Sequence, residues 1–535
     1  MASSSEAPAR SENGYRYDSI SDPNAPTSSR TESPSLSMSP VPTAKQPTVR
    51  LLAPDLQRGL LMALMAMDHL ALGLNTWQHG TNIDGEMDGL IVRRWNFTTA
   101  YIVRTLTHFC APGFTFLLGM GVVLLSQSRT RLGWSAGRLM QYYAVRGLVL
   151  TAVTWIIGLV ASGGQFWFMN VVLFSLGVDY VLAGMLWLLM DRTEKWLGGV
   201  LERGLLIMDK RSGAVYVPTT NDDEDEEGGV SQPLLLGRRH AARESERAAT
   251  ASSLSWHIHN IFLVVISVIT IWWNIWLSED HGRCSLDTEG SDGSVSTQFV
   301  PTSKHPFLAI WFWYVSTERV MSNFPPMAWL SFAILGLLYG RIITARKWTI
   351  SAVAIGHASA GVIFAAIFVL TRLLRVGNLS EDCLHTPAQD AQTANENPYL
   401  ASAASFFYII KYPPDVAFWA FTMAGNLFML GAFSSIPVHV AKRFGMLLSF
   451  GTSSLFFYVV HLNLVMSPLG TLLKNLFGTE TGHGDPMHPG NTKGIANLFV
   501  YFIFWCLLLL IMWPACFYYS RFKSTRHADS LWRFF

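Results

Sequence analysis

The stretch LLMALMAMDHLALGL, residues 60–74, has the composition of a membrane helix, yet Asp68 and His69 stand side by side within it. About 20 apolar residues in a helix cross the roughly 30 Å of hydrocarbon in a bilayer. A charged side chain there costs at least a few kcal/mol, so an ionisable residue inside a span usually has a function. The stretch therefore predicts a membrane span with a polar site inside it.

The whole chain is too apolar for a soluble globular protein. Of its 535 residues, 50% are hydrophobic and 14% are charged, and the mean hydropathy is +0.28. Apolar windows predict ten spans, at residues 58–76, 101–125, 143–162, 167–190, 257–277, 326–344, 350–371, 414–437, 444–466 and 495–520. The predicted fold is an all-α polytopic bundle of about ten transmembrane helices.

One further apolar segment is ambiguous. Residues 306–325 are rich in aromatic side chains, but Glu318 and Arg319 shorten the apolar run. We expect this segment to lie at the membrane surface, with an eleventh span as the alternative.

Two polar segments set the expected domain boundaries. Residues 1–50 carry Ser, Pro and scattered charges, a composition that predicts a disordered cytoplasmic tail. Residues 191–255 include the run NDDEDEEGG and predict a flexible acidic loop on the cytoplasmic side. The membrane-embedded chain is then divided into an N-terminal part, 51–190, and a C-terminal part, 256–535.

Basic residues indicate the orientation, because Lys and Arg are enriched in cytoplasmic connections. They follow the second, sixth, eighth and last predicted spans, at Arg129, Arg131, Arg138, Arg341, Arg346, Lys347, Lys442, Arg443, Arg521, Lys523 and Arg526. This pattern predicts that both termini are cytoplasmic. Arg93, Arg94, Arg372 and Arg375 are exceptions to it.

The loops on the other side carry features of the secretory pathway. Asn96 and Asn378 each begin an N-x-Ser/Thr sequon, which is glycosylated only on the outer or lumenal side. Cys284 and Cys383 lie in outer loops, where a disulfide can form. The sequence thus predicts a multi-pass protein of the plasma membrane or of a vacuole-like or lysosome-like endomembrane of a eukaryote.

The ionisable residues inside the spans reach a similar depth. His69 lies eleven residues after Arg58, which places it about 16 Å along the helix, and His108 in the antiparallel second span falls at a matching level. Pro112 cannot donate to the carbonyl of His108, and such a break is tolerated only where protein or a cavity covers it. His461 is expected to face the same cavity, and Asp179 in the fourth span is a further candidate.

Several functions fit such a cluster. A buried histidine near a carboxylate can act as a general base, or it can relay protons in a transporter. Haem ligation is disfavoured because the cytoplasmic halves of the spans offer no second histidine pair, and no metal is expected. A transporter would favour inverted repeats, but RTLTHFCAPGF at 104–114 has no counterpart in the second half. A non-catalytic membrane scaffold is the third hypothesis.

Five segments give a resemblance to a known family. They are APDLQRG leading into MAMDH at 53–69, RTLTHFCAPGFTFLLG at 104–119, PPMAWLSFAILGLLYGR at 325–341, KYPPDVAFWAFTMAGN at 411–426 and FGTSSLFFYVVHLNL at 450–464. In order and spacing they resemble the heparan-alpha-glucosaminide N-acetyltransferase catalytic-domain family of transmembrane acyltransferases, over roughly 52–190 and 300–520. The resemblance implies transfer of an acetyl group from cytosolic acetyl-CoA to an acceptor, in the best-known case the amine of a terminal glucosamine.

The resemblance also implies roles for individual residues. Asp55, Arg58 and Gly59 match the family's Asp-x-x-Arg-Gly at the cytoplasmic start of the first span, and Arg58 with Arg146 and the arginines after the second span would neutralise the phosphates of CoA. In the animal lysosomal member, the position equivalent to His69 resembles Asn, and the essential histidine follows the first span. The nearest match to that histidine here is His79.

Bacterial-type members instead resemble this chain at Asp68-His69 and at THFCAP, residues 107–112. His69 and His108 are therefore the leading catalytic candidates, with Asp68 orienting one of them and His79 third.

Taken together, the sequence predicts an integral-membrane acetyltransferase or wider acyltransferase with acetyl-CoA as co-substrate. A histidine would be the general base or a transient acyl carrier, and the acceptor would be an amino sugar or another glycan-like amine or hydroxyl on the outer side. The alternative is a proton-coupled transporter that uses Asp68, His69 and His108 as a relay. Membrane lipid is an expected partner, nucleic acid is not, and a homodimer is left open.

Overall fold

Nine helices in the described part of the chain are long and apolar enough to cross a membrane. The computed structural model describes residues 52–78, 86–211, 232–278, 281–282, 306–393, 396–466, 468–485, 490–526, 530 and 532. Each of the nine overlaps a span that the sequence predicts, so the all-α polytopic membrane fold is confirmed. The predicted tail, residues 1–50, lies outside the described residues.

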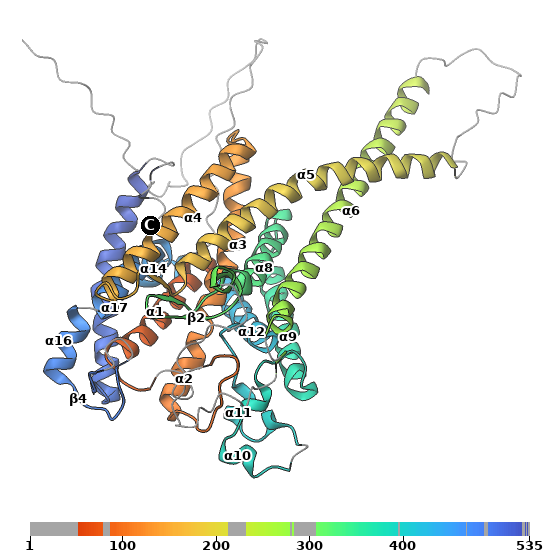
Figure 1. The fold of residues 1–535 in the computed structure, drawn as a ribbon. Coiled ribbons are helices and arrows are strands. Elements are labelled where there is room, and N and C mark those ends of the chain that lie inside the picture. The colour runs from red at the N-terminus through yellow and green to blue at the C-terminus, as the bar shows by residue number, and fades with distance from the viewer. Residues whose placement is uncertain are drawn as a thin grey trace, which may run out of the picture. The chain divides into compact units, whose positions relative to one another are not determined.

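The nine spanning segments are built from eleven helices (Figure 1). They are α2 (Thr98–Thr107) with α3 (Cys110–Arg131), α4 (Ala136–Ala161), α5 (Leu173–Arg211), α6 (Gln232–Trp276), α8 (Pro326–Ala345), α9 (Ile350–Leu374), α12 (Val416–Ser434), α15 (Ser454–Met466) with α16 (Pro468–Phe477), and α17 (Leu498–Thr525). Shorter helices lie between them, namely α10 (Pro387–Asp390), α11 (Ala403–Phe407), α13 (Val438–Ala441) and α14 (Gly445–Thr452).

The first predicted span is α1 (Leu52–Gly73), which lies within the bundle (Figure 1). It packs against α3, α12, α14, α15 and α17. Of its 22 residues, 15 are buried, although it is not among the nine helices that are long and apolar enough to cross a membrane. Because neighbouring helices cover most of its surface, α1 can carry ionisable side chains that a lipid-facing helix could not.

Glycine permits a close crossing between α1 and α14. A Cβ atom on Gly59 would lie 2.0 Å from the carbonyl oxygen of Leu447, and one on Gly451 would lie 1.9 Å from the carbonyl oxygen of Asp55. Membrane helices that approach this closely need small residues at the contact. The backbones of α1 and α14 are thus held together at the level of Arg58.

The second predicted span is broken where the sequence predicts a kink. The break between α2 and α3 falls at His108 and Phe109, in line with the missing N–H of Pro112. Asn426 of α12 donates a hydrogen bond to the carbonyl oxygen of Phe109 at 3.1 Å. Gln57 of α1 donates in turn to the side-chain oxygen of Asn426 at 2.9 Å. Neighbouring helices therefore cover the break, as the membrane interior requires.

Residues 306–325 do not form an eleventh span. They form the seven-residue helix α7 (Pro306–Phe312) and two short strands, β2 (Val315–Ser316) and β3 (Val320–Ser322). The strand β3 pairs in parallel with β1 (Phe168–Asn170) and antiparallel with β2. The alternative of an extra span is wrong, because a seven-residue helix is far shorter than the bilayer.

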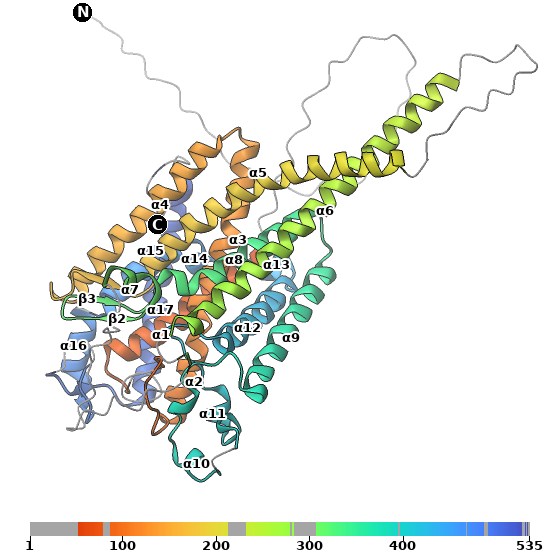
Figure 2. The same cartoon turned by 45° about the vertical axis from the view of Figure 1, so that its right-hand side comes forward.

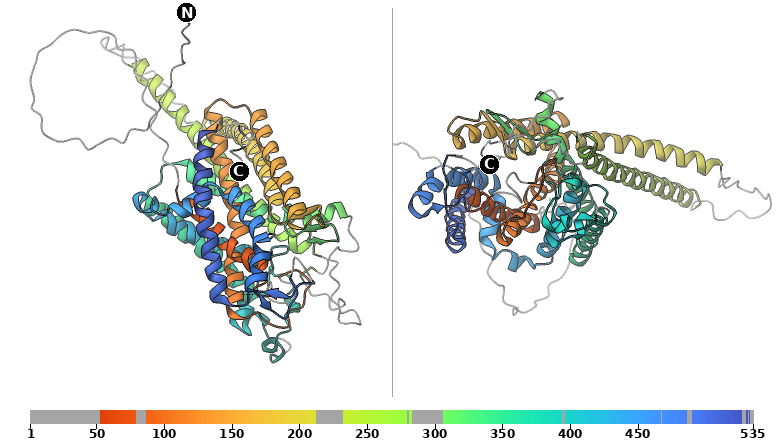
Figure 3. Two further views of the ribbon diagram at one scale, coloured as in Figure 1. Left: turned by 90° about the vertical axis from the view of Figure 1, so that its left-hand side faces the viewer. Right: turned by 60° about the horizontal axis from the view of Figure 1, so that its bottom comes forward.

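The predicted flexible loop, residues 191–255, is largely helical. Helix α5 continues to Arg211 and α6 begins at Gln232, so only residues 212–231 lie outside the described chain. The two helices run side by side away from the spanning region (Figures 2 and 3). Arg247 pairs with Asp209 at 2.8 Å, and Ser255 donates to the carbonyl oxygen of Glu194 at 2.8 Å. The acidic run at 221–229 lies outside the described residues, whereas the segments on either side of it are rich in helix formers that pair with each other.

The bundle has two chemically different ends. The arginine-rich end is where α1 begins and where α3, α8 and α12 finish, and it carries Arg58, Arg131, Arg346 and Arg443. The loop end is formed by residues 86–97 and 376–415, which are joined by the bridges between Met87 and Tyr412 and between Val92 and Leu384. Helices of the predicted N-terminal and C-terminal parts pack into one unit, so these parts are not separate domains.

Candidate functional site

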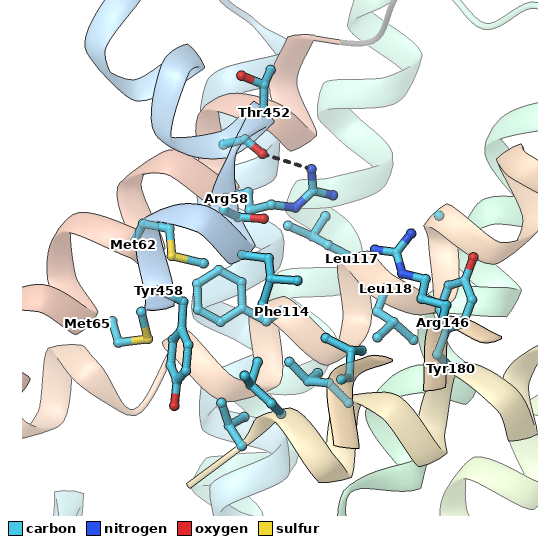
Figure 4. Close-up of a pocket in the computed structure, with 18 of the residues that line it drawn as sticks. Arg58, Met62, Met65, Phe114, Leu117, Leu118, Arg146, Tyr180, Thr452 and Tyr458 are labelled. Atoms are coloured by element: carbon cyan, nitrogen blue, oxygen red, sulfur yellow. Dashed lines mark hydrogen bonds between the residues drawn. The ribbon is translucent and has the colours of Figure 1, made fainter. Parts of the chain in front are cut away.

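A pocket of about 280 Å³ lies among α1, α3, α4, α5, α14, α15 and α17. Its positively charged lining residues are Arg58, Arg146 and Lys523, and its apolar ones include Met62, Met65, Phe114, Leu117, Leu118, Leu150, Leu173 and Leu176. In Figure 4, Arg58 and Arg146 approach from different helices, and Met65 and Tyr458 lie together away from both guanidinium groups. The pocket is thus cationic in one region and apolar in another.

The Asp-x-x-Arg-Gly segment builds one wall of this pocket. Arg58 donates to Asp55 at 3.1 Å. It also donates to the carbonyl oxygen of Gly451 at 3.3 Å, the hydrogen bond drawn in Figure 4. The close crossing at Gly59 brings that carbonyl within reach. Asp55, which the sequence predicts to bind the cofactor, does not line the pocket but positions Arg58.

The other two cations reach the pocket from α4 and α17. The Arg146 guanidinium lies 4.6 Å from the centre of the Tyr180 ring, a cation–π contact that directs it into the cavity. Lys523 donates to the carbonyl oxygen of Thr452 at 3.4 Å. Arg129 and Arg138, which we expected near the phosphates, instead stack on Trp134 and do not line the pocket.

One face of α1 leads from the cations to His69. Arg58, Met62, Met65 and His69 are spaced by 4, 3 and 4 residues, so their side chains lie on one stripe of the helix. The first three line the pocket, and His69 follows one turn beyond Met65. From Arg58 to His69 the stripe rises by about 16 Å. The His69 ring is 6.2 Å from the ring of Tyr458, which also lines the pocket.

His69 forms a hydrogen-bonded pair with His461 of α15. Nδ1 of His69 lies 2.9 Å from Nε2 of His461, and the two rings are stacked. Nδ1 of His461 lies 2.7 Å from the carbonyl oxygen of Phe457, which can only accept a hydrogen. His461 is therefore protonated on Nδ1 and accepts at Nε2, so a neutral His69 donates from Nδ1 and keeps its lone pair on Nε2. His461 is fully buried, whereas His69 is half-buried.

Asp68 belongs to a second cluster, which we call the Arg104 network. Arg104 binds Asp68 at 3.2 Å and Glu86 at 2.9 Å, and His108 lies 3.1 Å from the same oxygen of Glu86. Arg104, Glu86 and His108 are buried. Asp68 is thus linked to His108 through Arg104 and Glu86, while His69 pairs with His461.

The Arg104 network carries fixed charges. Burial alone would raise the pKa of Glu86, but the Arg104 guanidinium beside it outweighs burial and holds that pKa well below its ordinary value. Glu86 lies in the segment before α2, outside the spanning helices. A carboxylate held in this state serves as a permanent acceptor for Arg104 and His108.

The space around His108 is closed. It is lined by Glu86, Tyr101, Arg104, Thr105, His108, Phe407, Tyr408 and Ile409 and has no room for a water molecule. Within the described chain, Nδ1 of His108 has no hydrogen-bond partner. His69 and His108 therefore face different surroundings, and His69 is the one beside the pocket.

The other predicted residues lie apart from the pocket or outside the described chain. His79 falls among residues 79–85, which the structure does not describe. Asp179 is fully buried in α5, and neither of its carboxylate oxygens has a hydrogen-bond partner among the described residues. No group of three or more His, Cys, Asp or Glu side chains in that part of the chain could hold a metal ion.

The predicted modification sites lie at the loop end. Asn378 is buried, its Oδ1 accepts from Arg372 at 2.8 Å, and its Nδ2, the atom that would carry a glycan, donates to the carbonyl oxygen of Thr371 at 2.9 Å. Its glycosylation stays a prediction. Asn96 is half-buried and donates to the carbonyl oxygen of Gln78 at 3.0 Å, and its glycosylation stays a prediction.

Of the two cysteines in the predicted disulfide, the structure describes only one. Cys383 is disulfide-bonded. Its predicted partner, Cys284, lies outside the described residues, so that pairing stays a prediction.

Sequence reasoning missed four residues that shape these clusters. Lys523 was considered only as an indicator of orientation, and Tyr458 had no signal beyond its position three residues before His461. Glu86 lies outside the predicted spans, and Arg104 lies near the end of one, where a basic residue is ordinary. Arg104 and His108 are four residues apart, one helical turn, and this spacing was the available signal.

The chain matches no protein-family model, and no curated protein is similar to it in sequence. A proposal for its function therefore rests on the fold, on these two clusters and on the sequence segments described above.

Proposed function

We propose that the protein is a transmembrane acyltransferase that uses an acyl-CoA, with acetyl-CoA as the first choice, and that His69 is its general base. The observation that carries this proposal is the stripe on α1, which runs from Arg58 through Met62 and Met65 to His69. The family resemblance of the five sequence segments points to the same chemistry.

The pocket suits a donor with a charged head and a long arm. Arg58, Arg146 and Lys523 supply three positive charges for phosphate groups, for which a forked guanidinium is well adapted. The apolar lining beyond them suits an uncharged arm and a short acyl group. About 16 Å separate Arg58 from His69 along the helix, so the phosphates and the thioester must be joined by an extended chain.

Transfer then follows from the state of the histidine pair. Nε2 of His69 takes the proton from an acceptor amine or hydroxyl as the acceptor attacks the thioester carbonyl carbon. The carbon–sulfur bond breaks, and the departing thiolate receives that proton from His69, which restores the neutral imidazole. His461 holds His69 in the required tautomer and is a positioning residue.

We assign the Arg104 network a structural part in this scheme. Its paired charges hold α1 to α2 and to the loop end, and thereby fix the rotation of α1 that aims His69 at the pocket. The acceptor, an amino sugar or another glycan-like amine or hydroxyl, rests on the family resemblance alone. The transporter alternative needs the same residues to change protonation, which buried ion pairs oppose.

Binding of radiolabelled CoA to the purified protein in detergent tests the proposal. We expect saturable binding that weakens about tenfold in Arg58→Gln and in Arg146→Gln, since each variant loses one charge-assisted contact worth roughly 1.4 kcal/mol. Arg131→Gln is the matched control, because Arg131 lies at the same end but does not line the pocket. Absence of saturable binding, together with pH-driven solute uptake into vesicles, would establish the transporter instead.

A further inference from the structure

A second cavity opens between α6 and α8, away from the pocket described above. It has a volume of about 890 Å³ and is lined by residues 249–264 of α6, residues 338–348 at the end of α8, and Glu194 of α5. We call it the α6–α8 groove. Figure 2 shows the two helices beside each other at this place. It shares no lining residue with the cationic pocket.

The lining of the groove changes from polar to apolar along its length. Ser252, Ser253, His257 and Arg346 lie toward the arginine-rich end, whereas Ile261, Val264, Leu338 and Ile342 lie deeper. Helix α6 rises by about 22 Å from residue 249 to residue 264. This matches the roughly 20 Å thickness of one leaflet including its headgroups. Ile261, Val264 and Ile342 are exposed, as side chains that face lipid are.

Two tryptophans mark the boundary between these regions. Trp348 donates from Nε1 to the carbonyl oxygen of Ile342 at 3.0 Å, which folds the ring back over the end of α8. Trp256 lines the groove from α6. Tryptophan is enriched at the level of lipid headgroups because its ring is apolar and its N–H is polar.

Arg346 supplies a positive charge at the headgroup level. Its guanidinium lies 3.8 Å from the centre of the Trp348 ring, which fixes its place at the rim. Among the described residues no carboxylate pairs with it, whereas the other charged partners at this site, Arg341 and Glu194, bind each other at 2.7 Å. Arg346 thus offers a charged N–H donor group to the rim of the groove, and such a group suits a phosphate.

We propose that the α6–α8 groove is a binding site for one anionic glycerophospholipid of the leaflet at the arginine-rich end. The phosphate binds Arg346, the glycerol region lies beside Ser253 and His257, and an acyl chain follows Ile261, Val264 and Ile342 into the hydrocarbon. This leaflet is the predicted cytoplasmic one, where anionic lipids concentrate. The proposal does not depend on the acyltransferase assignment.

Native mass spectrometry of the full chain in a neutral detergent tests the site. The probes are dioleoyl phosphatidylserine and dioleoyl phosphatidylcholine, titrated separately. We expect wild-type protein to bind one phosphatidylserine more tightly than phosphatidylcholine. Arg346→Gln should weaken phosphatidylserine about tenfold, or roughly 1.4 kcal/mol, and leave phosphatidylcholine unchanged. Arg443→Gln, which alters an exposed arginine at the same end, should bind as wild type does.

A second variant keeps the test decisive even where Arg346→Gln misfolds. Ser253 is exposed and lines the headgroup region, so Ser253→Trp fills the groove without disturbing packed helices. It should abolish the tight phosphatidylserine complex. Wild-type binding in Ser253→Trp or in Arg346→Gln overturns the proposal, as does equal binding of the two lipids. Displacement of phosphatidylserine by millimolar inorganic phosphate would also overturn it, because the site would then recognise a soluble anion.

Discussion

Replacing Glu86 with alanine should destabilise the protein more than any exposed acidic substitution. Glu86 is fully buried and binds both Arg104 and His108, and Arg104 itself is 4% exposed. Removing one partner from a buried ion pair costs about 3–5 kcal/mol, because the remaining charge stays buried. Asp68 still holds Arg104 at 3.2 Å, so we take the lower value of about 3 kcal/mol.

Thermal unfolding in detergent, followed by tryptophan fluorescence, measures this effect. We expect the melting temperature of Glu86→Ala to fall by about 3–6 °C. Asp191→Asn is the matched control. It breaks an ion pair with Lys195 whose side chains are 40% and 73% exposed, and such pairs contribute about 0.3–0.5 kcal/mol. Equal shifts for the two variants would refute a buried Arg104 network.

A double variant separates loss of the charge pair from loss of packing. Glu86→Gln with Arg104→Met removes both charges while keeping similar volumes. It should be more stable than the sum of the single effects predicts, because neither charge is left buried alone. Strict additivity would show that the two side chains do not interact.

Three further predictions follow from the same contacts. The difference in the free energy of unfolding between wild type and Glu86→Gln should shrink as the pH falls below about 4.5, the ordinary pKa of the Glu86 carboxyl group. Melting curves recorded at a series of pH values measure this difference. The folded-state pKa lies below that value, so the unfolded state binds more protons and acid removes the contribution. His461→Phe should lower acyl transfer about 2- to 13-fold, the value of one hydrogen bond of 0.5–1.5 kcal/mol, and shift its pH profile, with CoA affinity unchanged. Gly451→Ala should weaken CoA binding at least tenfold, because its Cβ would lie 1.9 Å from a carbonyl oxygen of α1, whereas Gly445→Ala has open space and should bind as wild type does.

For each of these three predictions, one result would contradict it. If the difference in free energy of unfolding between wild type and Glu86→Gln stays constant down to pH 3, Glu86 is not charged in the folded protein. A His461→Phe variant with wild-type turnover and pH profile would remove the positioning role. Equal CoA binding by the two glycine variants would show that the α1–α14 crossing does not shape the pocket.

Hydropathy was sufficient to predict the spans, because burial in lipid acts on every residue of a helix at once. All nine apolar helices of the described chain overlap predicted spans. Hydropathy carries less information for α1, which is surrounded by protein, and for residues 191–211, where helix formation depends on pairing with α6. Residues 306–325 had the composition of a membrane segment but not the length.

The site was only partly predictable for a geometric reason. Counting residues along a helix predicts depth, and the expectation that His69 and His108 lie at one level stays a prediction. Counting does not give the direction in which each side chain points across helices. His461 was proposed to share the cavity and does contact His69, but the partner of His108, Glu86, lies in a connecting segment that hydropathy disregards.

The central claim is that His69, and not His108, performs the chemistry. Transfer of radiolabelled acetyl from acetyl-CoA, normalised to folded protein, tests it most directly in His69→Gln and His108→Gln. Loss of a general base should lower the turnover of His69→Gln by about 10²–10⁴-fold with CoA binding intact, while His108→Gln loses stability but retains turnover per folded molecule. Wild-type turnover in His69→Gln, with activity lost only in His108→Gln, would contradict the account.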